Sequence, residues 1–139
     1  MPQFLFDTDH LTLFQYQHVP LMQRIATHPP DAIGICPINI EETMRGRLAV
    51  LSRVLSGPKN VQAYAHLAAA EAMLRLFPLI PFDLASEIRF QHLRAAKLGI
   101  GTLDLKISAI ALTNGLTVLT RNRSDFGRVP NLLTEDWSA

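Results

Sequence analysis

This sequence has one cysteine, one tryptophan and little charge of either sign. Cys36 has no partner for an internal disulfide, and the five histidines, at positions 10, 18, 28, 66 and 92, lack the close spacing of zinc ligands. No apolar run reaches the roughly 20 residues needed to span a bilayer, and the first residues do not resemble a signal peptide. We therefore expect a protein of the reducing cytoplasm that has no membrane segment.

Apolar residues, in contrast, are plentiful. They make up 48% of the 139 residues, which is enough for one compact core, so we expect a single domain over residues 1–139. The formal net charge is +1 and the charged fraction is 18%. These values exclude a polycation that coats nucleic acid, and any contact with nucleic acid must come from local basic patches.

Short apolar runs alternate with helical patterns along the chain. The pattern predicts strands at residues 4–6, 32–36, 79–82 and 117–120, with polar or turn residues after each. One helix is expected to follow the first strand, with Thr8 or Asp9 as its cap. Further helices are expected from 37 to about 55, from 60 to 77, from 84 to 98 and from 102 to 114. This alternation predicts an α/β layered fold with a mainly parallel sheet, whose ligands collect at the carboxyl ends of the strands.

Two expectations concern the burial of helix residues. Val61 and Tyr64 belong to the apolar pattern of the alanine-rich helix at 60–77, which is interpreted as scaffold rather than site. Ile88 is expected to face inward in the helix that follows Asp83.

Four acidic residues occur at the boundaries of these predicted elements. Asp7 ends the first strand, Glu42 and Asp104 stand near helix starts, and Asp125 lies in a predicted loop after the last strand. A few converging carboxylates suit a hard cation such as Mg²⁺, and a cation would relieve their mutual repulsion. The alternative is that each acid caps a helix or lies on the surface.

With the flanking residues included, the sequence resembles a PIN domain of the VapC toxin type over nearly its whole length. The segments that carry this resemblance are Phe4–Asp9, Ile38–Gly46, Gly99–Ala109 and Thr120–Phe126, followed by Val129–Leu132 and Glu135–Trp137. Each motif alone is weak, whereas all of them in this order and spacing make a specific match. The resemblance implies a three-layer α/β/α PIN fold.

The resemblance also implies an activity and a site. Such a protein is the metal-dependent endoribonuclease toxin of a toxin–antitoxin pair, with Asp7, Glu42, Asp104 and Asp125 as catalytic residues. Mg²⁺ or Mn²⁺ would be bound by Asp7, Asp104 and Asp125. Glu42 is chosen over Glu41 because the family glutamate lies four residues before a glycine, here Gly46. The implied partners are RNA, an antitoxin protein and a second copy of the chain.

Supporting roles are expected for residues beside the acids. Thr8, Asp9, Thr120 and Asn122 would contact the metal-site carboxylates or waters, although Asp9 replaces a more usual asparagine and could instead cap a helix, and Thr120 and Asn122 could be turn residues. Arginines border the acids, and phosphate is a ligand that arginine binds well. Arg45, Arg121 and Arg123 are the candidate RNA contacts, against the alternative of solvated surface charges.

Two other functions fit parts of the sequence. A non-catalytic PIN-like module could bind metal, RNA or protein without turnover. A strand followed by Asp-x-Asp also opens haloacid-dehalogenase-like phosphatases, in which the first aspartate is the nucleophile. This chain departs from that second motif at Leu11 and lacks its late Gly-Asp pair.

Overall fold

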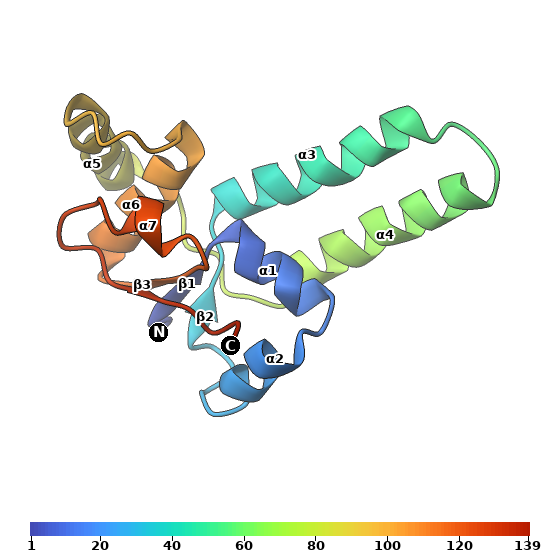
Figure 1. Ribbon diagram of the computed structural model, residues 1–139, viewed down its shortest axis with the longest axis horizontal. Coiled ribbons are helices and arrows are strands. Elements are labelled where there is room, and N and C mark those ends of the chain that lie inside the picture. Colours follow the sequence, from blue (N-terminus) through green and yellow to red (C-terminus); the bar gives the residue numbers. More distant parts are fainter.

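The computed structural model describes residues 1–139 and contains a parallel four-stranded sheet with helices on both faces (Figure 1). The sheet order is β2-β1-β3-β4, with every neighbouring pair parallel. Its strands are β1 (Phe4–Phe6), β2 (Ile33–Gly34), β3 (Thr117–Leu119) and β4 (Thr134–Glu135). The predicted three-layer α/β/α architecture is therefore confirmed.

Alternation along β1 divides the core between the two faces of the sheet. Phe4 and Phe6 face a cluster that includes residues of α1 (Thr8–Gln15), α2 (Val19–Ile25) and α4 (Pro58–Leu74). Leu5 faces the other way, against α6 (Thr102–Asn114), and α5 (Leu84–Ala95) packs on the outer side of α6. Residues on both sides of each central strand are thus buried, which explains its unbroken apolar run.

Helix α3 (Pro37–Arg53) and helix α4 form a long hairpin that projects from the sheet (Figure 1). The small side chains Ala63 and Ala70 are buried in α4, as its alanine-rich pattern predicted. Val61 and Tyr64 are 71% and 58% exposed, so the expectation that they pack into the scaffold was wrong. They lie on the outer part of the hairpin, where no third element covers them.

Several predicted boundaries were also wrong. Asp7, rather than Thr8 or Asp9, is the N-cap residue of α1, and its side chain makes no capping hydrogen bond. Residues 79–82 form only an isolated bridge between Leu79 and Ile35, because the segment leaves the sheet edge after one contact. Ile88 is 49% exposed, since α5 lies at the outside of the molecule and only one of its faces meets α6.

Two short elements escaped sequence analysis. Asp125 lies in the one-turn helix α7 (Arg123–Phe126), not in a loop, and β4 was not predicted at all. Neither is long enough to show a periodic pattern. By contrast, α6 ends at Asn114 as predicted, and Gly115 follows with a φ of 66°, in the left-handed region that glycine adopts most readily. None of the helices is long and apolar enough to cross a membrane.

Candidate active site

The first acid of the site, Asp7, directly follows β1, beside the end of β3. The Thr120 hydroxyl donates a hydrogen bond of 2.8 Å to Asp7 Oδ2, which fixes the carboxylate across the two strands. Asp7 is only 7% exposed. Burial raises the pKa of Asp7 to about 6, and the negative charges of Asp104 and Glu42 act in the same direction. The protein therefore buries a carboxyl group at an energetic cost.

Asp104 and Asp125 approach from the first turns of α6 and α7. Burial raises the pKa of Asp104, and the charges of Glu42 and Asp125 raise it further. Asn122 Nδ2 donates to Asp125 Oδ2 at 3.0 Å, and the Asn122 backbone N–H donates to the Thr120 hydroxyl at 2.9 Å. A continuous set of hydrogen bonds thus joins Asp7 to Asp125.

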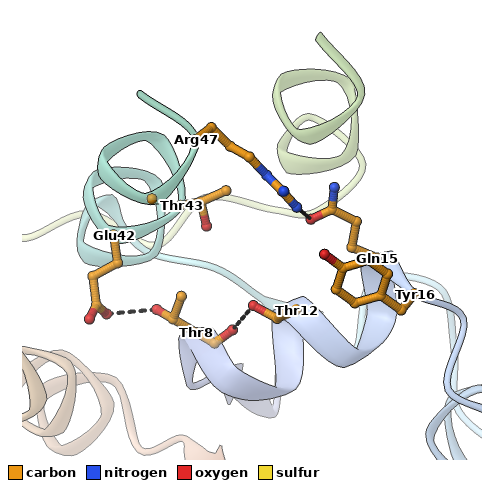
Figure 2. Close-up of a pocket in the computed structure, with 8 residues that line it drawn as sticks. Thr8, Thr12, Gln15, Tyr16, Glu42, Thr43 and Arg47 are labelled. Atoms are coloured by element: carbon orange, nitrogen blue, oxygen red, sulfur yellow. Dashed lines mark hydrogen bonds between the residues drawn. The ribbon is translucent and has the colours of Figure 1, made fainter. Parts of the chain in front are cut away.

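Glu42 completes the acidic group from α3. The Thr8 hydroxyl donates to Glu42 Oε1 at 2.7 Å (Figure 2). The neighbouring Glu41 is exposed and pairs with Arg45 one turn further along α3. The negative charge of Glu42 contributes to the raised pKa values of both Asp7 and Asp104, in each case after burial. The geometry therefore places Glu42, and not Glu41, with the other acids.

Sequence reasoning missed Asn39, a fully buried side chain in the first turn of α3. Its amide donates to the Phe6 carbonyl at 3.0 Å and to the Thr8 hydroxyl at 3.1 Å, and its oxygen accepts the Cys36 N–H at 2.8 Å. Asn39 thus ties α3 to the end of β1 and orients Thr8 toward Glu42. The local sequence does not mark Asn39, because its burial and its hydrogen-bond partners are apparent only in the folded structure.

The donor set fits a hard divalent cation in its chemistry. Carboxylates and nearby amide and hydroxyl oxygens are the ligands that Mg²⁺ and Mn²⁺ prefer. A cation would favour the ionised form of Asp7, whose pKa is raised by burial and, to a smaller extent, by the charges of Asp104 and Glu42. No group of three or more His, Cys, Asp or Glu side chains is close enough to hold a metal ion in the present arrangement. Thr8, Thr120 and Asn122 each donate a hydrogen bond to one of the acids, namely Glu42, Asp7 and Asp125.

The charged neighbours of the site differ from simple expectations. Asp9 neither caps a helix nor joins the four acids, because Arg121 donates to both of its carboxylate oxygens at 2.7 and 2.6 Å. The same bonds lower the pKa of Asp9. Arg45 is paired with Glu41, whereas Arg123 is exposed and forms no salt bridge. Of the three candidate RNA contacts, only Arg123 is free of an acidic partner.

Comparison with known proteins identifies the class to which this arrangement belongs. The PIN domain family pattern matches residues 15–132. The chain is 28% identical over 95 residues to a tRNA(fMet)-specific endonuclease VapC of Shigella flexneri, covering 66% of this chain and 72% of the relative. It is 31% identical over 102 residues to a ribonuclease VapC1 of Rickettsia felis, covering 70% and 71%.

A solved structure supports the same fold. The VapBC complex of Salmonella typhimurium, crystallised with DNA, contains a chain that matches with a TM-score of 0.81 and 23% identity over 99% of both chains. Fold and site together define an α/β/α domain with acids at the carboxyl edge of its parallel sheet. The chain belongs to the PIN-domain family, and its curated relatives are VapC ribonucleases. This membership removes the haloacid-dehalogenase alternative.

Proposed function

We propose that this chain, as one PIN domain over residues 1–139, is the ribonuclease toxin of a toxin–antitoxin pair. It hydrolyses phosphodiester bonds in RNA with a site built from Asp7, Glu42, Asp104 and Asp125. The observation that carries this proposal is that Asp7 is buried and that the negative charges of Asp104 and Glu42 act on it. Carboxyl groups whose pKa values are raised by burial and by neighbouring charges are typical of catalytic and metal-binding sites.

Each acid has a proposed part in the reaction. Asp7, Asp104 and Asp125 would bind Mg²⁺ or Mn²⁺, which supplies an acidified water and stabilises charge that develops on the phosphate. Thr120 and Asn122 orient Asp7 and Asp125. One oxygen of Glu42 accepts a hydrogen bond from Thr8, and Oε2 accepts none. We therefore assign Glu42 as the base that takes the proton of the attacking water.

The proposed partners follow from the relatives. The similar solved structures are VapBC complexes and toxin–antitoxin systems, so a small antitoxin is the expected inhibitor of this chain. We further propose a homodimer and action in the cytoplasm, where RNA and the antitoxin are present. Arg123 would contact RNA directly, and Arg121 would do so after release from Asp9.

Cleavage of single-stranded and structured RNA by the purified chain tests the proposal. Mg²⁺ or Mn²⁺ should support cleavage and EDTA should abolish it. Asp104→Asn should lower kcat/KM at least about a hundredfold, because it removes a proposed metal ligand. Glu71→Gln is the matched control, since Glu71 is an exposed acid of α4 that pairs with Arg75.

The same assay separates the rival function. A non-catalytic module would bind RNA or metal and give no cleavage under any of these conditions. Cleavage that survives EDTA, or that is unchanged by Asp104→Asn, would contradict the proposed mechanism.

A further inference from the structure

A polar groove begins at the acidic site and runs along α1 and α3 (Figure 2). It has a volume of about 230 Å³, and Thr8 and Glu42 belong both to it and to the site described above. At its other end lie Gln15, Tyr16 and Arg47. Because the groove shares Glu42 with the acids, a molecule bound in it would also touch the site.

Two side-chain bridges between α1 and α3 mark the ends of this groove. Thr8 donates to Glu42 at the acidic end, and Arg47 Nη2 donates to Gln15 Oε1 at 2.6 Å at the far end (Figure 2). Arg47 forms no salt bridge, so its charge is not neutralised by an acid of this chain. One of its five N–H donors is used by Gln15, which leaves the others for a ligand.

Gly46 supplies an independent observation. It lies inside α3 and lines the groove, although glycine within a helix lowers helix stability relative to alanine. A Cβ built at Gly46 meets no atom within 4 Å, so no close contact inside this chain requires a glycine there. Because Gly46 lines the groove, a large side chain at this position would occupy part of it.

The lining indicates the chemistry of the ligand. Tyr16 is 67% exposed and offers an aromatic ring, on which an unpaired base can stack. Arg47 suits a phosphate, and the threonine hydroxyls and the Gln15 amide suit sugar hydroxyls and base edges. Pockets for whole drug-sized ligands begin at about 300 Å³. This groove, at about 230 Å³, is smaller, so it suits a short part of a longer strand better than a whole drug-sized ligand.

We propose that the groove binds one unpaired nucleotide of the RNA substrate, next to the phosphodiester that is cleaved. Tyr16 stacks on the base, Arg47 holds a phosphate, and Gly46 leaves room for the strand. Glu42 and Arg47 are separated by five positions of α3, a rise of about 7.5 Å. The strand therefore passes from the acids to Arg47 within one nucleotide. This inference rests on the proposed ribonuclease function and assigns part of its substrate recognition.

Binding to a 12-nucleotide single-stranded RNA of mixed sequence, measured by fluorescence anisotropy in an Asp104→Asn background, tests the inference. Tyr16→Ala should raise Kd by about five- to a hundredfold, the range expected for loss of one stacked base. Arg47→Gln, which removes a charged phosphate contact, and Gly46→Leu, which fills the groove, should each raise Kd at least about fivefold. Ala49→Leu and Arg53→Gln are matched controls on exposed positions of α3 outside the groove, and Kd should change less than twofold. Gly46→Leu should not lower Tm.

Abasic substitution along the RNA identifies the stacked base. At one position the abasic RNA should bind wild-type and Tyr16→Ala protein (both in the Asp104→Asn background) equally, because the contact is already lost. The inference would be overturned if the losses of binding from the abasic site and from Tyr16→Ala add fully at every position of the RNA. It would also be overturned if Gly46→Leu leaves Kd unchanged. A third outcome would also overturn it: Gly46→Leu still binds RNA but no longer binds a co-expressed antitoxin. That result would assign the groove to a protein partner.

The outcome for the groove is separable from that for the activity. Cleavage by the wild-type chain with no effect of the groove variants on Kd would refute the groove alone. RNA binding that depends on Tyr16 and Gly46, with no cleavage by wild type, would refute the proposed activity and keep the groove.

Discussion

At the scale of single residues, Asp7 connects stability with the proposed function. Its pKa is raised from 3.8 to about 6, so the folded protein binds this proton more tightly than the unfolded chain does. The free energy of unfolding therefore falls as pH rises from about 4 to 6, and the ionised carboxylate destabilises the fold above that range. A cation that binds the ionised form would return part of this energy.

Asp7→Asn should consequently stabilise the protein at neutral pH. A rise of the pKa from 3.8 to about 6 corresponds to at most about 3 kcal/mol, and asparagine still offers an oxygen to Thr120. Thermal unfolding in EDTA should show a higher Tm for the variant at pH 7.5 and a smaller difference at pH 4.5. Glu71→Gln, at an exposed site, is the control. A lower Tm for Asp7→Asn at pH 7.5 would contradict the assigned cost of burial.

Glu42 and its neighbour Glu41 offer a matched pair of substitutions. Glu42 lies with the acids through Thr8, whereas Glu41 pairs with Arg45 on the exposed surface. Glu42→Gln should lower kcat about 10²- to 10⁴-fold, the range typical for loss of a general base. Glu41→Gln should stay within about twofold, because an exposed pair contributes little. Equal effects on RNA cleavage would refute the assignment of Glu42.

At the scale of elements, the segment around β4 closes one edge of the sheet. Its backbone pairs with β3, and Trp137 is buried beside Phe4 and His28, with ring centroids at 4.8 and 4.7 Å. The backbone N–H of Trp137 donates to Nε2 of the fully buried His10 at 3.0 Å. Burial lowers the pKa of His10, which favours the neutral ring that accepts this bond.

Trp137→Ala tests how strongly this segment is anchored. Removal of a fully buried aromatic side chain typically costs about 3–5 kcal/mol, and we expect a loss of that size in urea unfolding. Leu133→Ala, at a position that is 68% exposed, should change stability by less than about 0.5 kcal/mol. A similar small loss for Trp137→Ala would show that the segment is not part of the cooperative core.

The elements also show what sequence patterns can predict. β1, β3 and α6 follow directly from apolar runs and from the Asn-Gly stop at Gly115, since those signals are local. β4 and α7 were missed because two to four residues cannot display a period. The candidate acids were singled out by their places at element boundaries, whereas Asn39, Gln15, Tyr16 and Arg47 carry no comparable local signal.

At the scale of the whole molecule, the α3–α4 hairpin stands apart from the two-sided core. Beyond its first turn, α3 contains no fully buried residue, and Leu48, Leu55, Val61 and Tyr64 are each more than half exposed. Stability is not uniform in such a structure, because outer segments with few buried contacts open without global unfolding. The hairpin is therefore the least protected large part of the fold.

Hydrogen exchange measured by mass spectrometry checks this expectation. At low protein concentration, amides in the outer half of the hairpin (residues 46–66) should exchange faster than those of β1, β3 and α6. If the proposed homodimer covers these apolar side chains, protection of the hairpin should increase with protein concentration while that of β3 stays constant. Equal protection of hairpin and sheet at every concentration would contradict this view.

The sequence by itself determined the alternation of strands and helices, the ends of the central elements and the positions of the four acids along the chain. These features follow from local periodicity and from residues that stop or cap a helix. Only the tertiary structure decided that Thr8 bonds Glu42, that Arg121 binds Asp9, and that Arg47 reaches Gln15 across a groove. These contacts join residues at least 32 positions apart, so their partners depend on how the elements pack.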